Sequence, residues 1–451
     1  MLPEPLDKEA FATKLHAMLS PAEPVRTPER LLHREKQLRT IERALYAPGR
    51  HVFVYGDRGV GKSSLAATAA NQYQSAESAY LDVSCSPDAT FRSVIASIAS
   101  RAVADEESFL RATTRKETRE VDLKWLKMTR SRDVTSRKPE EMIRGVADAV
   151  EVLREVAALH SSKPIVVIDE FDRLMSRDER ALFADLLKQL GDKEVNIKFI
   201  FTGVAKSLDE LLGAHQSAIR QLETLHLDKL SWEGRWEIVV GALRSFGVEI
   251  DRNTYIRIAA VSDGYPFYVH LIAEKLLWRL WDRSDTATSV QPEDFVGALN
   301  DAIESISAEL KRPYEAATVN RSQDYEYVLW ASADSEFLHA YLRGIFTSYS
   351  RIVEHLGGQP LSYSQFRTRL RNLTKENYGE VLVPDPKRPG LYTYRENMLR
   401  GYVRLQAEAH GIRLSGYDPS SEEEQQIHVP ARASTGYRGP TVPRGVTFRR
   451  G

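Results

Sequence analysis

Cysteine is almost absent from this sequence, since Cys85 is the only one among 451 residues. An intrachain disulfide and a cysteine-rich zinc site are therefore excluded, and a reducing compartment is indicated. No apolar run approaches the roughly 18 residues that a membrane-spanning helix requires. The opening residues, MLPEPLDKEAF, lack the charged-then-apolar order of a signal peptide. We expect a cytoplasmic protein with no membrane partner.

The sequence also lacks an excess of charge of either sign, because 62 Lys and Arg oppose 63 Asp and Glu for a net charge of −1. No global field therefore attracts nucleic acid or membranes, although this average is compatible with local patches. The composition, 42% hydrophobic and 28% charged, is typical of a folded, soluble chain. At about 150 residues per unit, the length indicates roughly three structural units.

Five short runs rich in β-branched and aromatic residues alternate with helical stretches in the first half of the chain. They lie at 51–56, 78–84, 164–171, 196–203 and 222–230. Continuous apolar strands separated by helices are typical of a parallel sheet that helices cover on both faces. We therefore predict an α/β fold for this region.

A glycine-rich turn follows the first of these runs and fits the pattern G-x-x-x-x-G-K-[ST]. Its residues, with Ser64 directly behind them, are Gly56, Asp57, Arg58, Gly59, Val60, Gly61, Lys62 and Ser63. Such a loop turns backbone N–H groups and the N-terminus of the following helix toward phosphates. Lys62 is predicted to reach the β- and γ-phosphates, and Ser63 to supply a hydroxyl to Mg²⁺. A buried strand before the motif and a helix after it provide the context that a chance match would lack.

A pair of acids, Asp169 and Glu170, ends the third apolar run, where ligands bind in open α/β sheets. Asp169 is predicted to hold Mg²⁺ together with Ser63, and Glu170 to orient and deprotonate the attacking water. A charge pair at the start of a helix is the structural alternative. The phosphate loop upstream favours the catalytic interpretation.

With these two motifs the chain resembles the AAA+ superfamily of P-loop ATPases, in its initiator-like (origin-recognition-type) and STAND-like branch. The segment Leu32–Leu38, LHREKQL, resembles the box that cradles adenine in that family, with His33 where glycine is usual. The resemblance implies a sensor role near the γ-phosphate for Thr202. It also implies an arginine finger at Arg220, which acts on a neighbouring subunit's nucleotide and therefore implies a homo-oligomer. Structural alternatives are a strand end for Thr202 and a surface helix residue for Arg220.

Residues 231–312 are predicted to form the helical lid of such an ATPase. Where the commoner pattern has Gly-x-x-Arg with a sensor arginine, this chain reads Gly264-Tyr265-Pro266-Phe267, which resembles the STAND subgroup. The missing cation favours slow turnover and a nucleotide switch. His270, one turn further on, either contacts a phosphate or packs inside the lid.

Residues 321–412 follow the order helix, helix, helix, two short strands and closing helix, which predicts a winged helix. Its third helix and wing are basic, with Arg367, Arg369, Arg371, Lys375, Lys387 and Arg388. Duplex DNA bound through Arg367, Arg369, Arg371 and Lys387 is one interpretation. Docking to a protein, with these cations in solvent, is the other.

Three further segments complete the predicted domain organisation. Residues 1–30 form an N-terminal extension to a P-loop ATPase domain at 31–230, and residues 419–451 form a disordered tail. An insertion at 111–138 carries a charge of +6, from ten Lys and Arg against four acids, and either contacts DNA or is a solvated surface.

The predicted function is that of an ATPase switch that binds ATP and Mg²⁺, hydrolyses ATP and assembles into oligomers, with DNA as a candidate partner. The alternative is a nucleotide-binding signalling or scaffold protein that hydrolyses little and acts through protein partners. The absent sensor arginine favours the alternative, whereas the pair Asp169 and Glu170 favours hydrolysis.

Overall fold

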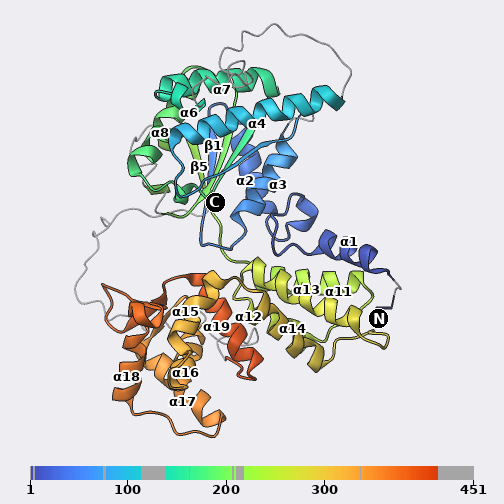
Figure 1. The fold of residues 1–451 in the computed structure, drawn as a ribbon, viewed down its shortest axis with the longest axis vertical. Coiled ribbons are helices and arrows are strands. Elements are labelled where there is room, and N and C mark those ends of the chain that lie inside the picture. Colours follow the sequence, from blue (N-terminus) through green and yellow to red (C-terminus); the bar gives the residue numbers. More distant parts are fainter. Residues whose placement is uncertain are drawn as a thin grey trace, which may run out of the picture.

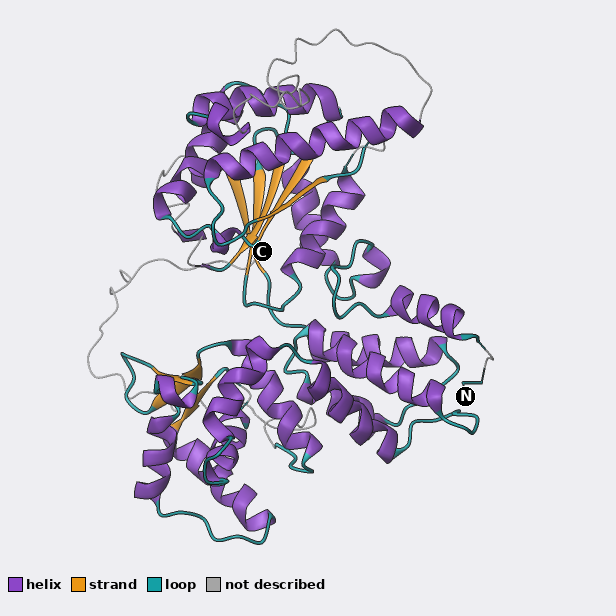
Figure 2. Ribbon diagram, in the orientation of Figure 1, coloured by secondary structure: helices purple, strands orange, loops and turns teal. Residues whose placement is uncertain are grey.

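The computed structural model describes residues 2–3, 6–74, 78–112, 139–161, 163–205, 208–209, 218–335 and 337–414. An α/β body lies above a largely helical lower body in Figures 1 and 2. The predicted insertion beyond residue 112 and the predicted tail both lie outside the described residues. No helix in the described ranges is long and apolar enough to cross a membrane.

A parallel five-stranded sheet in the order β2-β3-β4-β1-β5 forms the centre of the upper body. The predicted α/β fold class is therefore confirmed. The strands are β1 (His51–Tyr55), β2 (Leu81–Ser84), β3 (Ile165–Asp169), β4 (Lys198–Gly203) and β5 (Leu222–His226). All five strands are shorter than the predicted runs, and the fifth differs most, since it ends at His226. In the middle of the sheet, β3, β4 and β1 are almost entirely buried, which explains their continuous apolar sequences.

Helices cover both faces of this sheet, and alternate residues of one strand belong to different cores. Val52 and Val54 of β1 pack with α3, whereas Phe53 packs with the core of α4, α7 and α8. The helices of the upper body are α2 (Glu35–Tyr46), α3 (Lys62–Tyr73), α4 (Phe91–Ala112), α6 (Pro139–Met142), α7 (Val146–His160), α8 (Arg177–Asp192) and α10 (Ala218–Gln221). The short helices η1 (Pro28–Arg30) and η2 (Phe171–Arg173) complete it.

The N-terminal helix α1 (Lys8–Met18) packs on the helical group that follows the sheet. That group consists of α11 (Trp232–Ser245), α12 (Arg252–Val261), α13 (Pro266–Asp282) and α14 (Pro292–Ser305). Phe11 of α1 is fully buried, with ring centroids 4.7 Å from Trp278, and 5.4 Å from both Trp281 and Phe246. The N-terminal segment is therefore anchored to the predicted lid through an aromatic cluster.

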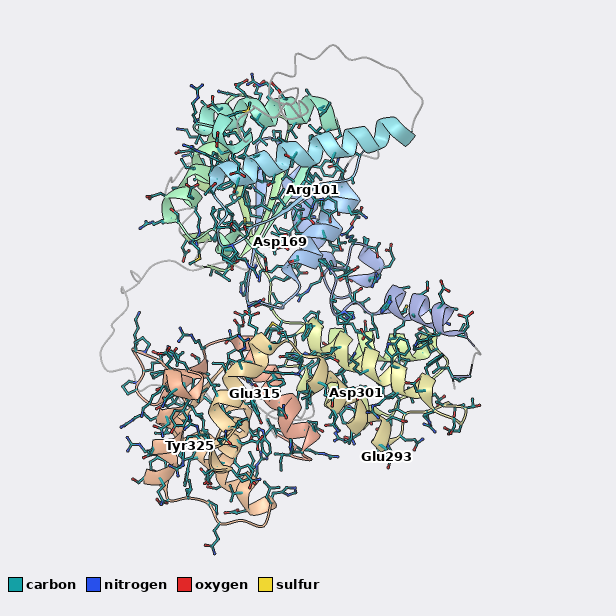
Figure 3. All side chains as sticks on the ribbon, viewed as in Figure 1. Arg101, Asp169, Glu293, Asp301, Glu315 and Tyr325 are labelled. Carbon is teal, nitrogen blue, oxygen red and sulfur yellow. The ribbon has the colours of Figure 1, made fainter. Side chains whose placement is uncertain are left out.

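The C-terminal part has the order helix, helix, strand, helix, helix, hairpin and helix. Its elements are α15 (Ala308–Thr318), α16 (Asp324–Ala333), β6 (His339–Tyr341), α17 (Leu342–His355), α18 (Tyr363–Asn372), η3 (Glu376–Tyr378), β7 (Leu382–Pro384), β8 (Leu391–Tyr394) and α19 (Asn397–Ala409). The three strands pair antiparallel in the order β6-β8-β7. Figure 3 labels Tyr325 in this part and Asp169 in the sheet body. The sequence pattern had not revealed β6, which has only three residues.

Candidate functional site

The loop between β1 and α3 wraps around the N-terminus of α3. Gly61 is the N-cap of that helix, with φ +96°, a left-handed conformation that glycine adopts without strain. Val60 in the loop is 1% exposed and anchors it to the core. The first turn of α3 therefore presents unpaired N–H groups and a positive dipole end, which together suit an anion.

Lys62 folds back across this loop. Its Nζ donates hydrogen bonds to the carbonyl oxygens of Gly56, at 3.1 Å, and Asp57, at 2.7 Å. Burial lowers the pKa of Lys62, while the nearby carboxylates of Asp172 and Asp169 act in the opposite direction. The ammonium group is thus partly desolvated, which strengthens its attraction for phosphate.

The side chain of Ser64, which the sequence pattern placed with the phosphate contacts, holds the N-terminal segment instead. Its Oγ accepts a hydrogen bond from the N–H of Val25, at 3.1 Å, and Thr68 one turn later donates to the Val25 carbonyl, at 3.0 Å. Residues 20–25 consequently lie along the helix of the phosphate loop.

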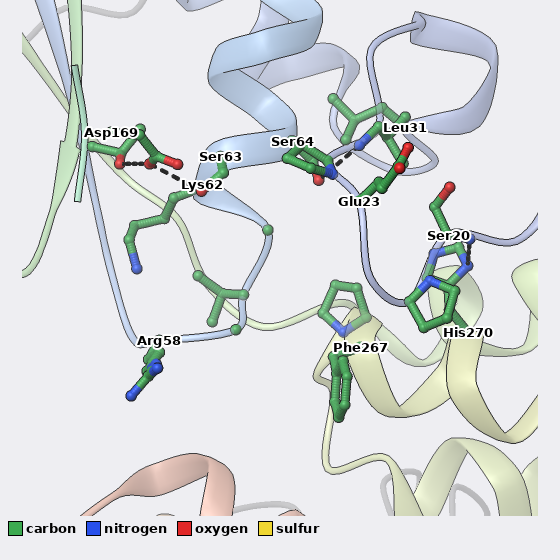
Figure 4. A pocket seen from close by; sticks show the side chains of 18 of the residues that line it. Ser20, Glu23, Leu31, Arg58, Lys62, Ser63, Ser64, Asp169, Phe267 and His270 are labelled. Carbon is green, nitrogen blue, oxygen red and sulfur yellow. Dashed lines mark hydrogen bonds between the residues drawn. The ribbon is translucent and has the colours of Figure 1, made fainter. Parts of the chain in front are cut away.

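Three oxygen-bearing side chains from separate segments meet at the carboxyl ends of β3 and β4. Ser63 Oγ donates to Asp169 Oδ1 at 3.0 Å, and the hydroxyl of Thr202 also donates to Asp169. Thr202 is 1% exposed. The structure therefore brings together Ser63, Asp169 and Thr202, as their predicted roles require (Figure 4 shows the first two).

Glu170 adopts a left-handed backbone conformation, with φ +54°, directly after β3. Its N–H donates to Asp169 Oδ1 and to Thr202 Oγ1, each at 3.1 Å, which holds this unusual turn. Its carboxylate lies 3.0 Å from Arg173 Nε. Burial raises the pKa of Glu170, and Arg173 partly opposes that shift. A carboxylate with a raised pKa is better matched to accepting a proton near neutral pH.

The oxygen atoms of Ser63 and Asp169 are the donors that Mg²⁺ prefers. No cluster of three or more His, Cys, Asp or Glu side chains able to hold a metal occurs in the described part of the chain. Two protein oxygens beside a phosphate loop fit Mg²⁺, which binds proteins through few side chains and takes its other ligands from water and phosphate.

Two residues of the LHREKQL segment position the phosphate loop in ways that the sequence did not reveal. Arg34 is 6% exposed, and its guanidinium donates to the carbonyls of Val60, at 3.3 Å, and Asp228, at 2.7 Å. His33 has φ +58°, so it keeps the left-handed backbone expected of the glycine it replaces. Its Nε2 lies 2.8 Å from Glu237 of α11, which links this segment to the lid.

The C-terminal elements also contact the phosphate loop. Arg58 forms two hydrogen bonds with Glu309 of α15, at 2.9 and 3.2 Å, and Asn397 Nδ2 donates to Asp57 Oδ2 at 3.0 Å. Met398 packs so closely that a Cβ added to Gly59 would lie 2.4 Å from its sulfur. No motif in the sequence points to these contacts, which join residues at least 250 positions apart. Arg58 and Asp57 therefore direct their side chains to the C-terminal elements.

Arg220 lies away from all these groups. It is exposed on α10, directly before β5, and His51 at the start of β1 pairs with Leu222. The phosphate loop follows the opposite end of β1. Arg220 therefore cannot reach the phosphate loop of its own chain.

A pocket of about 520 Å³ runs from the phosphate loop to the N-terminal segment. Lys62, Ser63 and Asp169 line one end, and Ser20, Leu31 and His270 line the other (Figure 4). Its size and mixed lining suit a small-molecule ligand.

The basic side chains predicted to contact DNA differ in their exposure to solvent. Arg367 and Arg371 of α18, and Lys387 in the turn between β7 and β8, are exposed. The guanidinium of Arg369 lies 5.2 Å from the ring centroid of Tyr325 and is half-buried.

Residues 30–200 match the family model described as AAA ATPase domain. No curated protein matches the chain. Among solved structures, the Walker-type ATPase PabY2304 of Pyrococcus abyssi is 17% identical with a TM-score of 0.50, and the match covers 85% of this chain and 99% of that one. The ORC2 protein of Aeropyrum pernix, in ADPNP–ADP complexes, is 14% identical with a TM-score of 0.46, covering 88% and 98%. Cdc6p from Pyrobaculum aerophilum is 16% identical with a TM-score of 0.43, covering 88% and 99%.

Proposed function

We propose that the chain, whose residues 30–200 match the AAA ATPase domain model, is a nucleotide-dependent switch that hydrolyses ATP with Mg²⁺. The observation that carries this proposal is the 3.0 Å hydrogen bond between Ser63 and Asp169. It joins the phosphate loop to the acid at the end of β3, across 106 residues of sequence.

The nucleotide is held by its phosphates. The N–H groups at the start of α3 and the ammonium of Lys62 bind the phosphate oxygens, and the opposite end of the pocket, beside Leu31 and His270, receives the nucleoside. Ser63 and Asp169 hold Mg²⁺, which when bound neutralises charge on the phosphates.

Hydrolysis depends on positioning water and on stabilising charge. Glu170 accepts a proton from the attacking water, and Thr202 fixes Glu170 through the bond to its N–H. The ion pair with Arg173 occupies the carboxylate of Glu170. This ion pair must therefore break before Glu170 can accept a proton from water.

The contacts of Arg58 with Glu309, and of Asp57 with Asn397, support a path by which nucleotide occupancy alters the C-terminal elements. The order of elements from α16 to β8 supports a winged helix, with α18 as its basic helix. Arg367, Arg371 and Lys387 are the cations best placed for duplex DNA, and they would contact phosphates.

A second candidate function is a scaffold that binds nucleotide and hydrolyses little. Phe267 occupies the lid position where the commoner pattern has an arginine, and this absence favours slow hydrolysis. Such a protein acts through the partner that its C-terminal elements bind.

Phosphate release by wild type and by Glu170→Gln, with and without duplex DNA, tests the proposal. We expect Glu170→Gln to bind ATP with the wild-type affinity and to hydrolyse it at least about 100-fold more slowly, because a general base contributes a factor of roughly 10² to 10⁴. Glu140→Gln, an exposed glutamate on α6, is the matched control and should hydrolyse normally.

The same assay separates the two candidate functions. Phosphate release stimulated by DNA supports a DNA-linked ATPase. ATP binding without release, in either condition, supports the scaffold. Equal rates for Glu170→Gln and wild type would show that Glu170 is not the base.

A further inference from the structure

A buried histidine lines the end of the pocket that is farthest from Asp169. His270 lies on α13, is 7% exposed and lines the pocket beside Ser20 and Leu31 (Figure 4). The surrounding lining combines apolar Pro21, Pro266 and Phe267 with charged Glu23 and Arg30. A buried polar ring in such a wall needs a hydrogen-bonding partner for each of its nitrogens.

One nitrogen of the ring has its partner in the protein. The N–H of Ser20 donates to His270 Nδ1 at 3.4 Å. Burial, and then the charge of Arg30, lower the pKa of His270 to about 4, so the ring is neutral at pH 7. A neutral imidazole that accepts at Nδ1 carries its proton on Nε2.

The second nitrogen is therefore a donor, and Nε2 has no hydrogen-bond partner in the part of the chain that the structure describes. This nitrogen is not among the fully enclosed polar atoms without a partner in the described residues, so it is open to an acceptor that enters the pocket. Ser20 directly follows the C-cap of α1, and Phe11 fixes α1 on the lid, so the ring's orientation is set before any ligand binds.

We propose that His270 Nε2–H donates a hydrogen bond to an acceptor on the nucleoside of the bound nucleotide and contributes to nucleotide selection. This inference rests on the proposed function. A phosphate is the less suitable acceptor, because the ring is uncharged and lies at the far end of the pocket from Lys62 and Ser63. The apolar residues around it suit a base, and the nucleoside offers acceptors on both its sugar and its base.

The test compares ATP with tripolyphosphate, which lacks the nucleoside, by calorimetric titration of the full chain. In His270→Phe, which keeps an aromatic ring and removes the donor, we expect ATP affinity to fall about 2- to 12-fold, as for one neutral hydrogen bond. Tripolyphosphate affinity should stay unchanged. His270→Gln, whose amide nitrogen takes the place of Nε2, should recover most of the loss. His160→Phe removes a buried histidine outside the pocket and should change neither affinity.

Analogues of ATP lacking single acceptors (2′-deoxy, 3′-deoxy, 1-deaza, 3-deaza and 7-deaza) test the proposal on wild type, even if His270→Phe does not fold. One analogue should bind wild type as weakly as ATP binds His270→Phe. The proposal is wrong if every analogue binds wild type as tightly as ATP, or if ATP and tripolyphosphate weaken by the same factor in His270→Phe. A wild type that binds tripolyphosphate and ATP equally overturns this inference alone, whereas one that binds neither overturns the proposed function as well.

Discussion

The proton-accepting role that we propose for Glu170 depends on a balance between burial and one neighbouring cation. Burial raises its pKa, and Arg173, 3.0 Å away, lowers it. Glu170 accepts a proton only when it is ionised, so hydrolysis is lost as the pH falls through its pKa. Because the pKa of Glu170 is raised, the acidic limb of the pH–rate profile should lie at a higher pH than the ordinary pKa of a glutamate would give.

Arg173→Ala therefore has an effect with a defined sign. Removing the cation raises the pKa of Glu170 further, so the acidic limb of kcat should move to higher pH, while the rate at pH 8 changes by less than about 10-fold. The pH profile of phosphate release measures this shift. Arg177→Ala, an exposed arginine at the start of α8, should leave the profile in place. A limb that moves to lower pH would contradict the assignment of Glu170.

At the scale of elements, α19 joins the C-terminal part to the rest through buried charge. Arg400 is 1% exposed, and its Nη1 lies 3.7 Å from Asp263 Oδ1. Lys229 Nζ lies 2.9 Å from the same carboxylate. Although burial acts to raise it, Arg400, Arg404 and Lys229 hold the pKa of Asp263 below its ordinary value. Helix α19, the segment after β5 that carries Lys229 and the segment after α12 that carries Asp263 are thus held together around one buried carboxylate.

Arg400→Ala should lower the free energy of unfolding by about 3 kcal/mol, the lower end for breaking a buried ion pair, because Lys229 still faces Asp263. Urea unfolding followed by tryptophan fluorescence measures it. Arg367→Ala, an exposed arginine on α18, should change the free energy by less than about 0.5 kcal/mol. If Arg400→Ala has as small an effect, the cluster does not stabilise the docking of α19.

The difference between local sequence patterns and contacts between distant segments explains which features of the fold and the site could be predicted from the sequence. Runs of β-branched residues predicted all five strands of the parallel sheet, the motifs predicted that Ser63 and Asp169 meet, and the family resemblance implied that Thr202 lies with them. Those features depend on local pattern and on strand order. The contact of Arg58 with Glu309 depends on how two distant parts pack, which no periodicity encodes. The three-residue strand β6 is too short to show alternation.

At the scale of the whole molecule, the position of Arg220 has a consequence for assembly. Its own phosphate loop lies beyond the opposite end of the strands, so an arginine finger at this residue can serve only another copy. The activity of one subunit would then depend on its neighbour. The near-zero net charge of −1 does not oppose such self-association by long-range repulsion.

Mixing two inactive variants tests this dependence. Arg220→Ala should bind ATP normally. Its hydrolysis rate should fall by at least about 10³-fold, because an arginine finger contributes roughly 10³ to 10⁵ in kcat. Lys62→Ala should fail to bind ATP but keeps Arg220. A mixture of the two should regain part of the phosphate release, because an interface that places the nucleotide site of Arg220→Ala against the arginine of Lys62→Ala is complete. Arg39→Ala, an exposed arginine on α2, should be active by itself. A mixture as inactive as its components would mean that Arg220 does not act between subunits, and full activity of Arg220→Ala alone would mean that it is not a finger.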